Sequence, residues 1–379
     1  MVRQDRFFTT EATHLAHAMP EAPVLYFRPE ALAARAETFL RGFPGQVTYA
    51  VKANPARHVL EALRASGISA FDVASPEEID WVRRVLPGAV LHYNNPVRAR
   101  GEIALAREAG VTSWSVDRMS ELDKLGDVAG HEISVRLKLP VLGAAYDFGA
   151  KFGAEPAAAT ALLAAAAARG ARPAICFHPG TQCTEPAAWV AYIHAAARVA
   201  DDAGVTLERL NVGGGFPAAR GGASPNFRAI FQAIERAAQD AFETPPALLC
   251  EPGRALVADA FSLALQVKAL SGEAIFLNDG VYGHLAEWRD MAAGAGVVTL
   301  GPDGPRNAQP EPRIVFGPTC DSIDRLPEVL ALPADIAEGD YLIFPGLGAY
   351  GSAIATGFNG YGRAETVTLS GTGHRVTEI

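Results

Sequence analysis

Short β-like runs alternate with helical segments from about residue 30 to residue 254, and this rhythm constrains the fold more than any other feature. The β-like runs are eight: VTYAVKA, SAFDVAS, AVLHYNN, TSWSVD, EISVRLKL, PAICFHPG, RLNVGGG and ALLCEPG. Several helical segments between them begin with Pro or Ser and end with Gly, as helices commonly do. Eight strands alternating with helices favour a closed parallel barrel over an open sheet. We therefore predict an α/β fold with a (β/α)8 TIM-like barrel.

The rhythm changes after Arg254, where strand-like runs follow one another without comparable helices. These runs are LVADAFSLALQVKAL, EAIFLND, VVTLG, RIVFG, DYLIFPG and ETVTLSG. A chain of 379 residues is also longer than one ordinary domain. We predict two domains: a barrel over residues 24–255, and a mostly β domain over residues 256–379 that residues 1–23 join.

Composition and charge exclude several classes of function. Hydrophobic residues make up 49% of the chain and charged residues 20%, which is typical of a globular protein with a sizeable core. A net charge of −9 without a Lys/Arg cluster argues against nucleic acid or a membrane as partner. The N-terminus has no long apolar stretch, so we expect a cytoplasmic protein. Neither a metal site nor disulfides are expected from the spacing of the cysteines, which are Cys176, Cys183, Cys250 and Cys320.

Polar residues and glycines stand at the ends of six predicted barrel strands, where barrels of this kind place their chemistry. They are Lys52, Asp72, Arg136, His178, the run Gly213–Gly215, and Glu251 with Gly253 and Arg254. Each also has a structural explanation: the charged residues as ion pairs, the histidine as a hydrogen-bonding group, the glycine run as a turn. Their common position at one rim favours function. A lysine, a glycine-lined phosphate cradle, a stacking histidine and a carboxylate are what a pyridoxal 5'-phosphate site needs.

With these residues in place, the chain resembles the fold type III, alanine-racemase-like barrel family of pyridoxal phosphate enzymes. Within that family it is most similar to the ornithine/diaminopimelate decarboxylase group, and to ornithine decarboxylases in particular. The matching motifs are YAVKAN, FDVAS, CFHPGTQC, NVGGGFP, CEPGR, NDGVYG, GPTCDS and GAYGSAIATGFNG. The resemblance runs from about residue 24 to the C-terminus.

The resemblance implies a role for each site residue. Lys52 is the implied Schiff-base lysine, His178 the imidazole stacked on the cofactor ring, and Glu251 the carboxylate at the pyridine nitrogen. Asp72 and Arg136 are expected near the lysine and the 3' oxygen of the ring. The remaining implied cofactor contacts, mostly to the phosphate, are Thr181, Gly214, Gly215, Gly253, Arg254 and Tyr350.

Cys320 and Asp321 resemble the family's pair that enters the active site from the other subunit. The cysteine is the implied proton donor to the product, and the aspartate the implied partner of the substrate's distal amine. A homodimer with shared active sites follows from that arrangement. The other expected substrate-binding residues are Tyr282, Glu287, Arg289, Asp290 and Phe358.

Glu251 also bears on the reaction, because racemases of this fold place an arginine at the pyridine nitrogen. We therefore expect decarboxylation, with a racemase as the weaker alternative. The presence of both Lys52 and Cys320 argues against an inactive regulatory homologue. The motif CDS, in place of the CES of diaminopimelate decarboxylases, favours a basic L-amino acid. The expected reaction is L-ornithine, or L-lysine, to the diamine and CO2 in polyamine biosynthesis.

The segment after Tyr282, HLAEWRDMAAGAG, leaves the substrate open. Ornithine decarboxylases carry a second amine-binding aspartate where this chain has Met291. Either Asp290 or Glu287 binds the amine after a one-turn adjustment, or Asp321 binds it alone, or Arg289 enters the pocket and selects another side chain. Trp288 either packs in the core or caps a pocket for a cation. The alternative substrates are carboxynorspermidine, diaminopimelate and S-methylmethionine.

Overall fold

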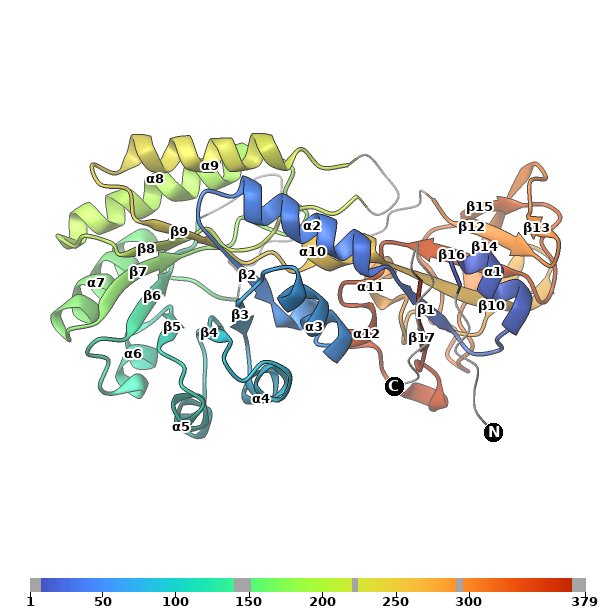
Figure 1. The fold of residues 1–379 in the computed structure, drawn as a ribbon, viewed down its shortest axis with the longest axis horizontal. Helices are drawn as coiled ribbons and strands as arrows, with labels where there is room; N and C mark the ends of the chain where they lie inside the picture. The colour runs from blue at the N-terminus through green and yellow to red at the C-terminus, as the bar shows by residue number, and fades with distance from the viewer. Residues whose placement is uncertain (1–7, 140–150, 220–223, 291–295, 370–379) are drawn as a thin grey trace. The chain divides into compact units, whose positions relative to one another are not determined.

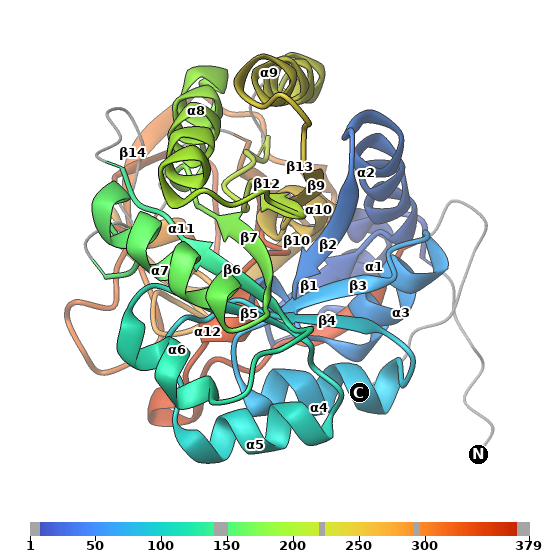
Figure 2. The same ribbon diagram turned by 90° about the vertical axis from the view of Figure 1, so that its left-hand side faces the viewer.

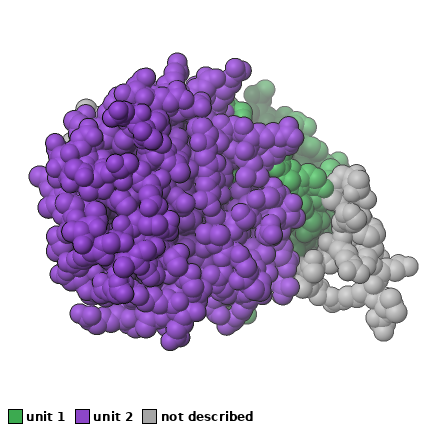
Figure 3. Space-filling view, turned by 60° about the vertical axis from the view of Figure 1, so that its left-hand side comes forward, with its two compact units in different colours: residues 1–34, 218–224, 256–379 green, residues 35–217, 225–255 purple. Residues whose placement is uncertain are grey.

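The computed structural model describes residues 8–139, 151–219, 224–290 and 296–369. The chain divides into two compact units, drawn in different colours in Figure 3. The barrel unit comprises residues 35–217 and 225–255, and the sheet unit comprises residues 1–34, 218–224 and 256–379. None of the described helices is both long enough and apolar enough to span a bilayer.

Eight parallel strands close into a barrel in chain order, with the last pairing with the first. The strands are β2 (Gln46–Ala50), β3 (Ala70–Val73), β4 (Val90–Tyr93), β5 (Ser113–Val116), β6 (Glu132–Arg136), β7 (Arg172–Cys176), β8 (Arg209–Asn211) and β9 (Ala247–Cys250). Each overlaps one of the eight runs expected from the sequence, and β2 and β7 begin one residue before theirs. The predicted (β/α)8 barrel with a mostly β second part is therefore confirmed.

Helices surround the barrel, as the view along its axis shows (Figure 2). They are α2 (Pro29–Gly42), α3 (Arg57–Ala65), α4 (Pro76–Val85), α5 (Arg100–Glu108), α6 (Met119–Leu125), α7 (Pro156–Ala168), α8 (Pro186–Ala203) and α9 (Phe227–Ala241). Their ends follow local chemistry. Ser75 caps α4 by accepting a hydrogen bond from the Glu78 backbone N–H, and Gly204 ends α8 in the left-handed conformation at φ 63°.

The sheet unit is built on nine strands, whose main path runs β13-β12-β16-β10-β11-β14-β15 (Figure 1). The strands are β1 (Val24–Phe27), β10 (Phe261–Ser271), β11 (Ala274–Leu277), β12 (Val298–Gly301), β13 (Gly304–Pro305), β14 (Pro310–Phe316), β15 (Leu330–Pro333), β16 (Tyr341–Pro345) and β17 (Glu365–Thr368). Short helices accompany them: α1 (Glu11–Ala18), α10 (Arg254–Val257), α11 (Ala286–Asp290) and α12 (Gly351–Ile354). The six strands expected in this part are present, and β1, β13 and β15 are additional.

The boundary expected at residue 24 falls inside the sheet unit, not at the start of the barrel unit. The reason is β1, which pairs antiparallel with β10 and parallel with β17. The barrel unit begins within α2, at Arg35. An isolated apolar run such as VLYF does not indicate which of two sheets it joins, because both bury their strands.

Candidate active site

The carboxyl ends of the barrel strands surround a cavity of about 200 Å³. Its lining comprises Lys52, Asp72, Ala74, Asn94, Asn95, Arg136, Phe152, Cys176, Phe177, His178 and Glu251. Five of these are residues expected at the site from the sequence, and they come from five different strand ends. The barrel therefore brings together side chains that are up to 199 positions apart in the sequence, from Lys52 to Glu251. Their positions at strand ends predicted this.

Lys52 lies in a single 3-10 turn, Val51–Ala53, that directly follows β2. Both neighbours are buried, whereas Lys52 itself is exposed on the cavity side of the turn. Gly253 packs beneath this turn, since a Cβ on Gly253 would lie 2.9 Å from Cβ of Ala53. Gly253 thus has a packing reason to be glycine, and its contact with a cofactor stays a prediction.

Glu251 follows β9 directly and is held by two amides. Asn94, after β4, and Asn211, the last residue of β8, both donate from Nδ2 to its Oε1. Burial raises the pKa of Glu251, while the Asn211 hydrogen bond and the positive charge of Lys52 oppose that shift. A carboxylate that accepts two hydrogen bonds is favoured as the anion, the form required beside a protonated ring nitrogen.

Asp72, at the third position of β3, lies in the same cavity as Glu251. Its Oδ1 is buried without a hydrogen-bond partner among the described residues. Burial, and then the negative charge of Glu251, raise the pKa of Asp72 well above its ordinary value. Two carboxyl groups in one cavity do not ionise together easily, and Asp72 is the one favoured to hold the proton.

His178 follows β7 and is neutral. Its Nδ1 accepts a hydrogen bond from the Gly180 backbone N–H at 3.2 Å, so the ring proton lies on Nε2. Burial, followed by the charges of Lys52 and Arg136, lowers the pKa of His178 well below its ordinary value. An uncharged imidazole at the wall of the cavity suits stacking on an aromatic ring.

The glycine run Gly213–Gly215 follows β8 and is packed tightly. Gly213 and Gly215 have φ of 71° and 82°, and a Cβ on Gly213 would lie 2.0 Å from the Phe177 carbonyl oxygen. A Cβ on Gly214 would lie 2.8 Å from the Glu251 carbonyl oxygen. The run is therefore a turn that the fold requires, and its binding of a phosphate, together with Thr181 and Arg254, stays a prediction.

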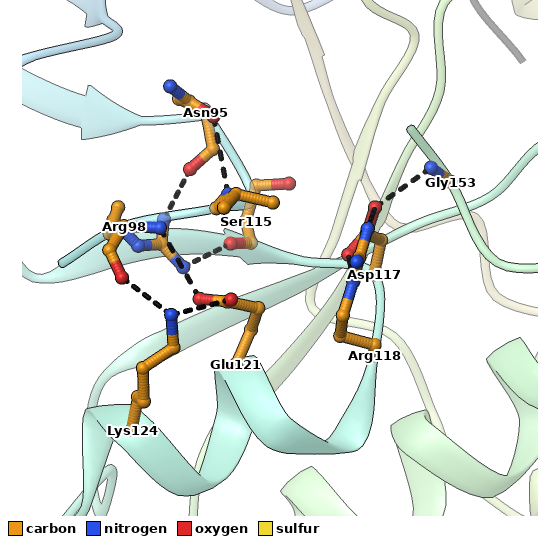
Figure 4. Close-up of polar contacts among 9 residues, drawn as sticks. Asn95, Arg98, Ser115, Asp117, Arg118, Glu121, Lys124 and Gly153 are labelled. Carbon is orange, nitrogen blue, oxygen red and sulfur yellow. Dashed lines mark hydrogen bonds and ion pairs between the residues drawn. The ribbon is translucent and has the colours of Figure 1, made fainter. Parts of the chain in front are cut away.

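Three residues of the site were not expected from the sequence: Asn94 and Phe152, which line the cavity, and Asn211, which binds Glu251. Phe152 lies under Arg136, whose guanidinium carbon is 5.3 Å from the ring centroid. The next residue, Gly153, donates its N–H to the buried Asp117 carboxylate, which is also paired with Arg118 (Figure 4). The two asparagines lie at strand ends, so their positions in the sequence could have predicted them as site residues. Phe152 lies in a loop, and no local sequence pattern predicts where that loop lies.

The side chains of the cavity fit pyridoxal phosphate by their chemistry. Lys52 offers an amine for the aldehyde, Glu251 a carboxylate with two amide donors for the ring nitrogen, and His178 a neutral ring for stacking. The unpaired, buried Oδ1 of Asp72 is a polar atom that a polar group of a bound ring would satisfy.

A second cluster of expected residues lies in the sheet unit; we call it the Cys320 cluster. It consists of Tyr282, Cys320, Asp321, Phe358 and Asn359. Tyr282 donates from its hydroxyl to Oδ2 of Asp321 at 2.7 Å, and this bond lowers the pKa of the carboxylate. Both the thiol and the backbone N–H of Cys320 donate to Oδ1 of Asn359 at 3.2 Å. The loop that carries both the implied proton donor and the implied amine partner is thus held by the segments of Tyr282 and Asn359.

The segment after Tyr282 forms α11. Glu287 is buried, and Trp288 is 1% exposed and packs edge-on against Phe344 at 5.1 Å. Of the two interpretations of Trp288, the core position is therefore correct and the pocket cap is wrong. Arg289 is exposed, and its charge acts on Tyr282, where it opposes the rise in the tyrosine pKa. The side chain of Asp290 and all of Met291 lie outside the described residues.

Tyr350, the remaining expected phosphate contact, lies in the sheet unit. It precedes α12 in the left-handed conformation, with φ 63°, which is uncommon for a residue other than glycine. Its contact with a phosphate stays a prediction.

Comparison with known proteins agrees with this chemistry. Residues 30–258 match the family described as pyridoxal-dependent decarboxylase, pyridoxal binding domain. The lysine/ornithine decarboxylase of Selenomonas ruminantium is 32% identical over 85% of this chain and 82% of its own length. The decarboxylase flvG of Aspergillus flavus is 31% identical over 85% of this chain and 80% of its own length.

Solved structures show the same fold. The arginine decarboxylase of Paramecium bursaria Chlorella virus superposes with a TM-score of 0.85 at 25% identity, over 94% of this chain and 98% of its own. The lysine decarboxylase of Selenomonas ruminantium superposes with a TM-score of 0.83 at 30% identity, over 96% and 97%. The family match covers the strands that build the cavity, so this chain belongs to the pyridoxal-dependent decarboxylases and uses pyridoxal phosphate as its cofactor.

Proposed function

We propose that this enzyme decarboxylates a basic L-amino acid, L-ornithine or L-lysine, to the diamine and CO2. The observation that carries the proposal is Asp321, whose carboxylate is kept ionised by the Tyr282 hydroxyl next to the Cys320 thiol. Such an anion suits the distal ammonium group of a basic side chain. The names of the relatives, which include ornithine, lysine/ornithine and arginine decarboxylases, support the same class of substrate.

When bound, pyridoxal phosphate supplies an aldehyde that captures the substrate amine and a ring that accepts the electron pair left by CO2. The residues of this chain create the conditions for that chemistry. Lys52 anchors the cofactor by its amine, and Glu251 holds a proton at the ring nitrogen. His178, which lines the cavity, would stack on the ring. Glu251 in this position supports decarboxylation over racemisation.

Cys320 donates the proton that replaces CO2 on the substrate, and Asp321 orients the substrate by its distal end. We propose that this pair acts in the site of a partner subunit in a homodimer. The surface around it supports a second copy of the chain as occupant, because Ile323 is 68% exposed and Phe358 is 44% exposed. Apolar side chains exposed beside a polar functional pair are typical of a surface that another subunit covers.

A second substrate class is supported by Arg289, whose positive charge acts on the hydroxyl of Tyr282. If Arg289 enters the substrate pocket, its charge favours an acidic or modified side chain. Carboxynorspermidine, diaminopimelate and S-methylmethionine remain the candidates of this class. A role in polyamine biosynthesis and a cytoplasmic location are further parts of the main proposal.

A substrate panel distinguishes the two classes. The cofactor-loaded enzyme is offered L-ornithine, L-lysine, L-arginine, meso-diaminopimelate, carboxynorspermidine and S-methylmethionine separately, and CO2 and amine products are measured by mass spectrometry. A clear lead in kcat/KM for ornithine or lysine supports the main proposal. If both are inert while another compound reacts, the substrate assignment is wrong and the decarboxylase assignment stands.

A further inference from the structure

Asn211 completes a ring of hydrogen bonds with Gly213 and Glu251. It is the last residue of β8 and is 4% exposed. Its Nδ2 donates to Oε1 of Glu251, and its Oδ1 accepts from the Gly213 backbone N–H at 2.9 Å. The Gly213 carbonyl oxygen in turn accepts from the Glu251 backbone N–H at 2.8 Å. Three hydrogen bonds therefore link one side chain, one glycine of the turn and one carboxylate.

The ring fixes the direction of each hydrogen bond. Gly213 N–H can only donate, so the Asn211 atom that faces it is the carbonyl oxygen, and the atom that faces Glu251 is the amide nitrogen. Asn94, just after the carboxyl end of β4, donates to the same oxygen, Oε1. Both amides donate to Oε1, which leaves Oε2 as the oxygen that we assign to a ligand.

We propose that Asn211 is a positioning residue for the cofactor: it holds Glu251 as an anion with Oε2 toward the ring nitrogen, and ties it to the Gly213–Gly215 turn. The inference rests on the proposed role of Glu251 at the ring nitrogen. It adds a mechanical link, because the group that binds the ring and the turn expected to bind the phosphate then move together. Positioning of this kind matters in catalysis, where small displacements of a charged group are costly.

Replacement of Asn211 by aspartate provides a discriminating test, because the two side chains have nearly the same shape. The new carboxyl keeps an acceptor for Gly213 N–H, but it donates to Glu251 only while the two carboxyls share a proton. As pH rises the pair loses that proton and the two anions repel. We expect Asn211→Asp to be near wild-type in kcat at about pH 6 and to decline toward about pH 9. Asn211→Ala is expected to be reduced about tenfold at every pH.

Cofactor affinity gives a readout that does not depend on turnover. Titration of the cofactor-free protein with pyridoxal phosphate, followed by absorbance, is expected to give a dissociation constant about tenfold higher for Asn211→Ala. Asn278 provides a matched control in the sheet unit, since it is buried, donates from Nδ2 to a carbonyl and accepts a backbone N–H at Oδ1. Asn278→Ala is expected to lower stability without changing cofactor affinity or the shape of the pH profile.

Glu251→Gln separates failure of this inference from failure of the proposed function. If Glu251→Gln lowers kcat about a hundredfold while Asn211→Asp keeps the wild-type pH profile and Asn211→Ala binds cofactor normally, the positioning role is wrong and the function stands. If Glu251→Gln itself retains wild-type kcat and cofactor affinity, the assignment of Glu251 fails, and the inference fails with it. Loss of stability alone in both Asn211 variants would also overturn the proposal.

Discussion

At the scale of single residues, the two carboxyl groups of the cavity differ in the protonation state that their neighbours favour. Glu251 receives two amide hydrogen bonds on one oxygen, whereas Asp72 has a buried oxygen without a partner among the described residues. The first is thereby suited to neutralise a cationic ring nitrogen. The second is suited to carry a proton near Lys52, since its pKa is raised well above the ordinary value by burial.

Tyr282 and Asp321 provide a prediction at this scale. The tyrosine hydroxyl donates to the carboxylate, and that hydrogen bond is the main cause of the lowered pKa of Asp321. In Tyr282→Phe the lowering is removed, so the carboxylate gains its proton at higher pH than in the wild type. We expect the acid limb of kcat/KM for ornithine or lysine to move to higher pH while the alkaline limb stays. An unshifted acid limb would mean that Asp321 does not bind the substrate ammonium.

At the scale of elements, the connection from β4 to β5 is organised by the buried Arg98 (Figure 4). Its guanidinium donates to the carbonyl oxygens of Tyr93, Asn95 and Ser115, and it is 2% exposed. Burial lowers its pKa to about 10, so it remains charged at neutral pH. The two carbonyl groups on β4 and its exit loop flank Asn94, and Arg98 therefore fixes the segment that carries one of the Glu251 donors.

Removal of Arg98 leaves three buried carbonyl groups without their donor. We expect Arg98→Met to lower the free energy of unfolding by about 3 kcal/mol, measured by urea denaturation of the cofactor-free protein. Arg41→Met is the control, because Arg41 is 80% exposed and pairs with Glu37 on the surface of its helix. Equal midpoints for the Arg98 and Arg41 variants would contradict a structural role for the buried guanidinium.

A polar layer joins four barrel strands through His92. Its Nδ1 lies 3.0 Å from the Ser113 hydroxyl, which donates to Glu132, and Arg209 pairs with the same glutamate. Burial, and then repulsion from Arg209, lower the pKa of His92 from 6.5 to about 3. Because the folded-state pKa lies below that of the unfolded chain, the unfolded chain binds the proton first as pH falls. Stability from this source is therefore lost between pH 6.5 and about 3.

We expect His92→Gln to remove this part of the pH dependence. Between about pH 7 and pH 5 the wild type should lose about 2 kcal/mol more of its unfolding free energy than the variant does. Urea denaturation of both proteins at the two pH values measures the difference, in which the contributions of the carboxylates cancel. Parallel losses in the two proteins would mean that His92 is protonated in the folded state or accessible to water.

At the scale of the whole molecule, what the sequence could predict depended on whether the relevant contacts were local. The eight barrel strands were found because each is a short buried run bounded by helix ends and glycines. The place of β1 was missed because it depends on pairing with β10 and β17, more than two hundred residues away. Lys52, His178 and Glu251 were predicted because they stand at strand ends. Asn211 also ends a strand, but the functional feature predicted there was the glycine run that follows it. The Cys320 cluster followed only from the family resemblance, since its three loops share no local signal.

The proposed sharing of active sites between subunits gives the last prediction. Lys52→Ala disables the barrel half of a site and Cys320→Ala disables the other half. In a homodimer with shared sites, random pairing of the two variants makes half the dimers mixed, and each mixed dimer has one intact site. We therefore expect co-expression of the two variants to restore about a quarter of wild-type activity, although each variant alone is inactive or nearly so.

The control pairs two variants of the same half, Lys52→Ala with Glu251→Gln. Every site in such a mixture contains one altered barrel, so no recovery is expected however the subunits pair. Recovery in the first mixture alone shows that Cys320 acts in the site of its partner. Failure of the first mixture, with mixed dimers demonstrated by differently tagged chains, would instead place both halves of each site in one chain. The exposed Ile323 and Phe358 would then need another explanation.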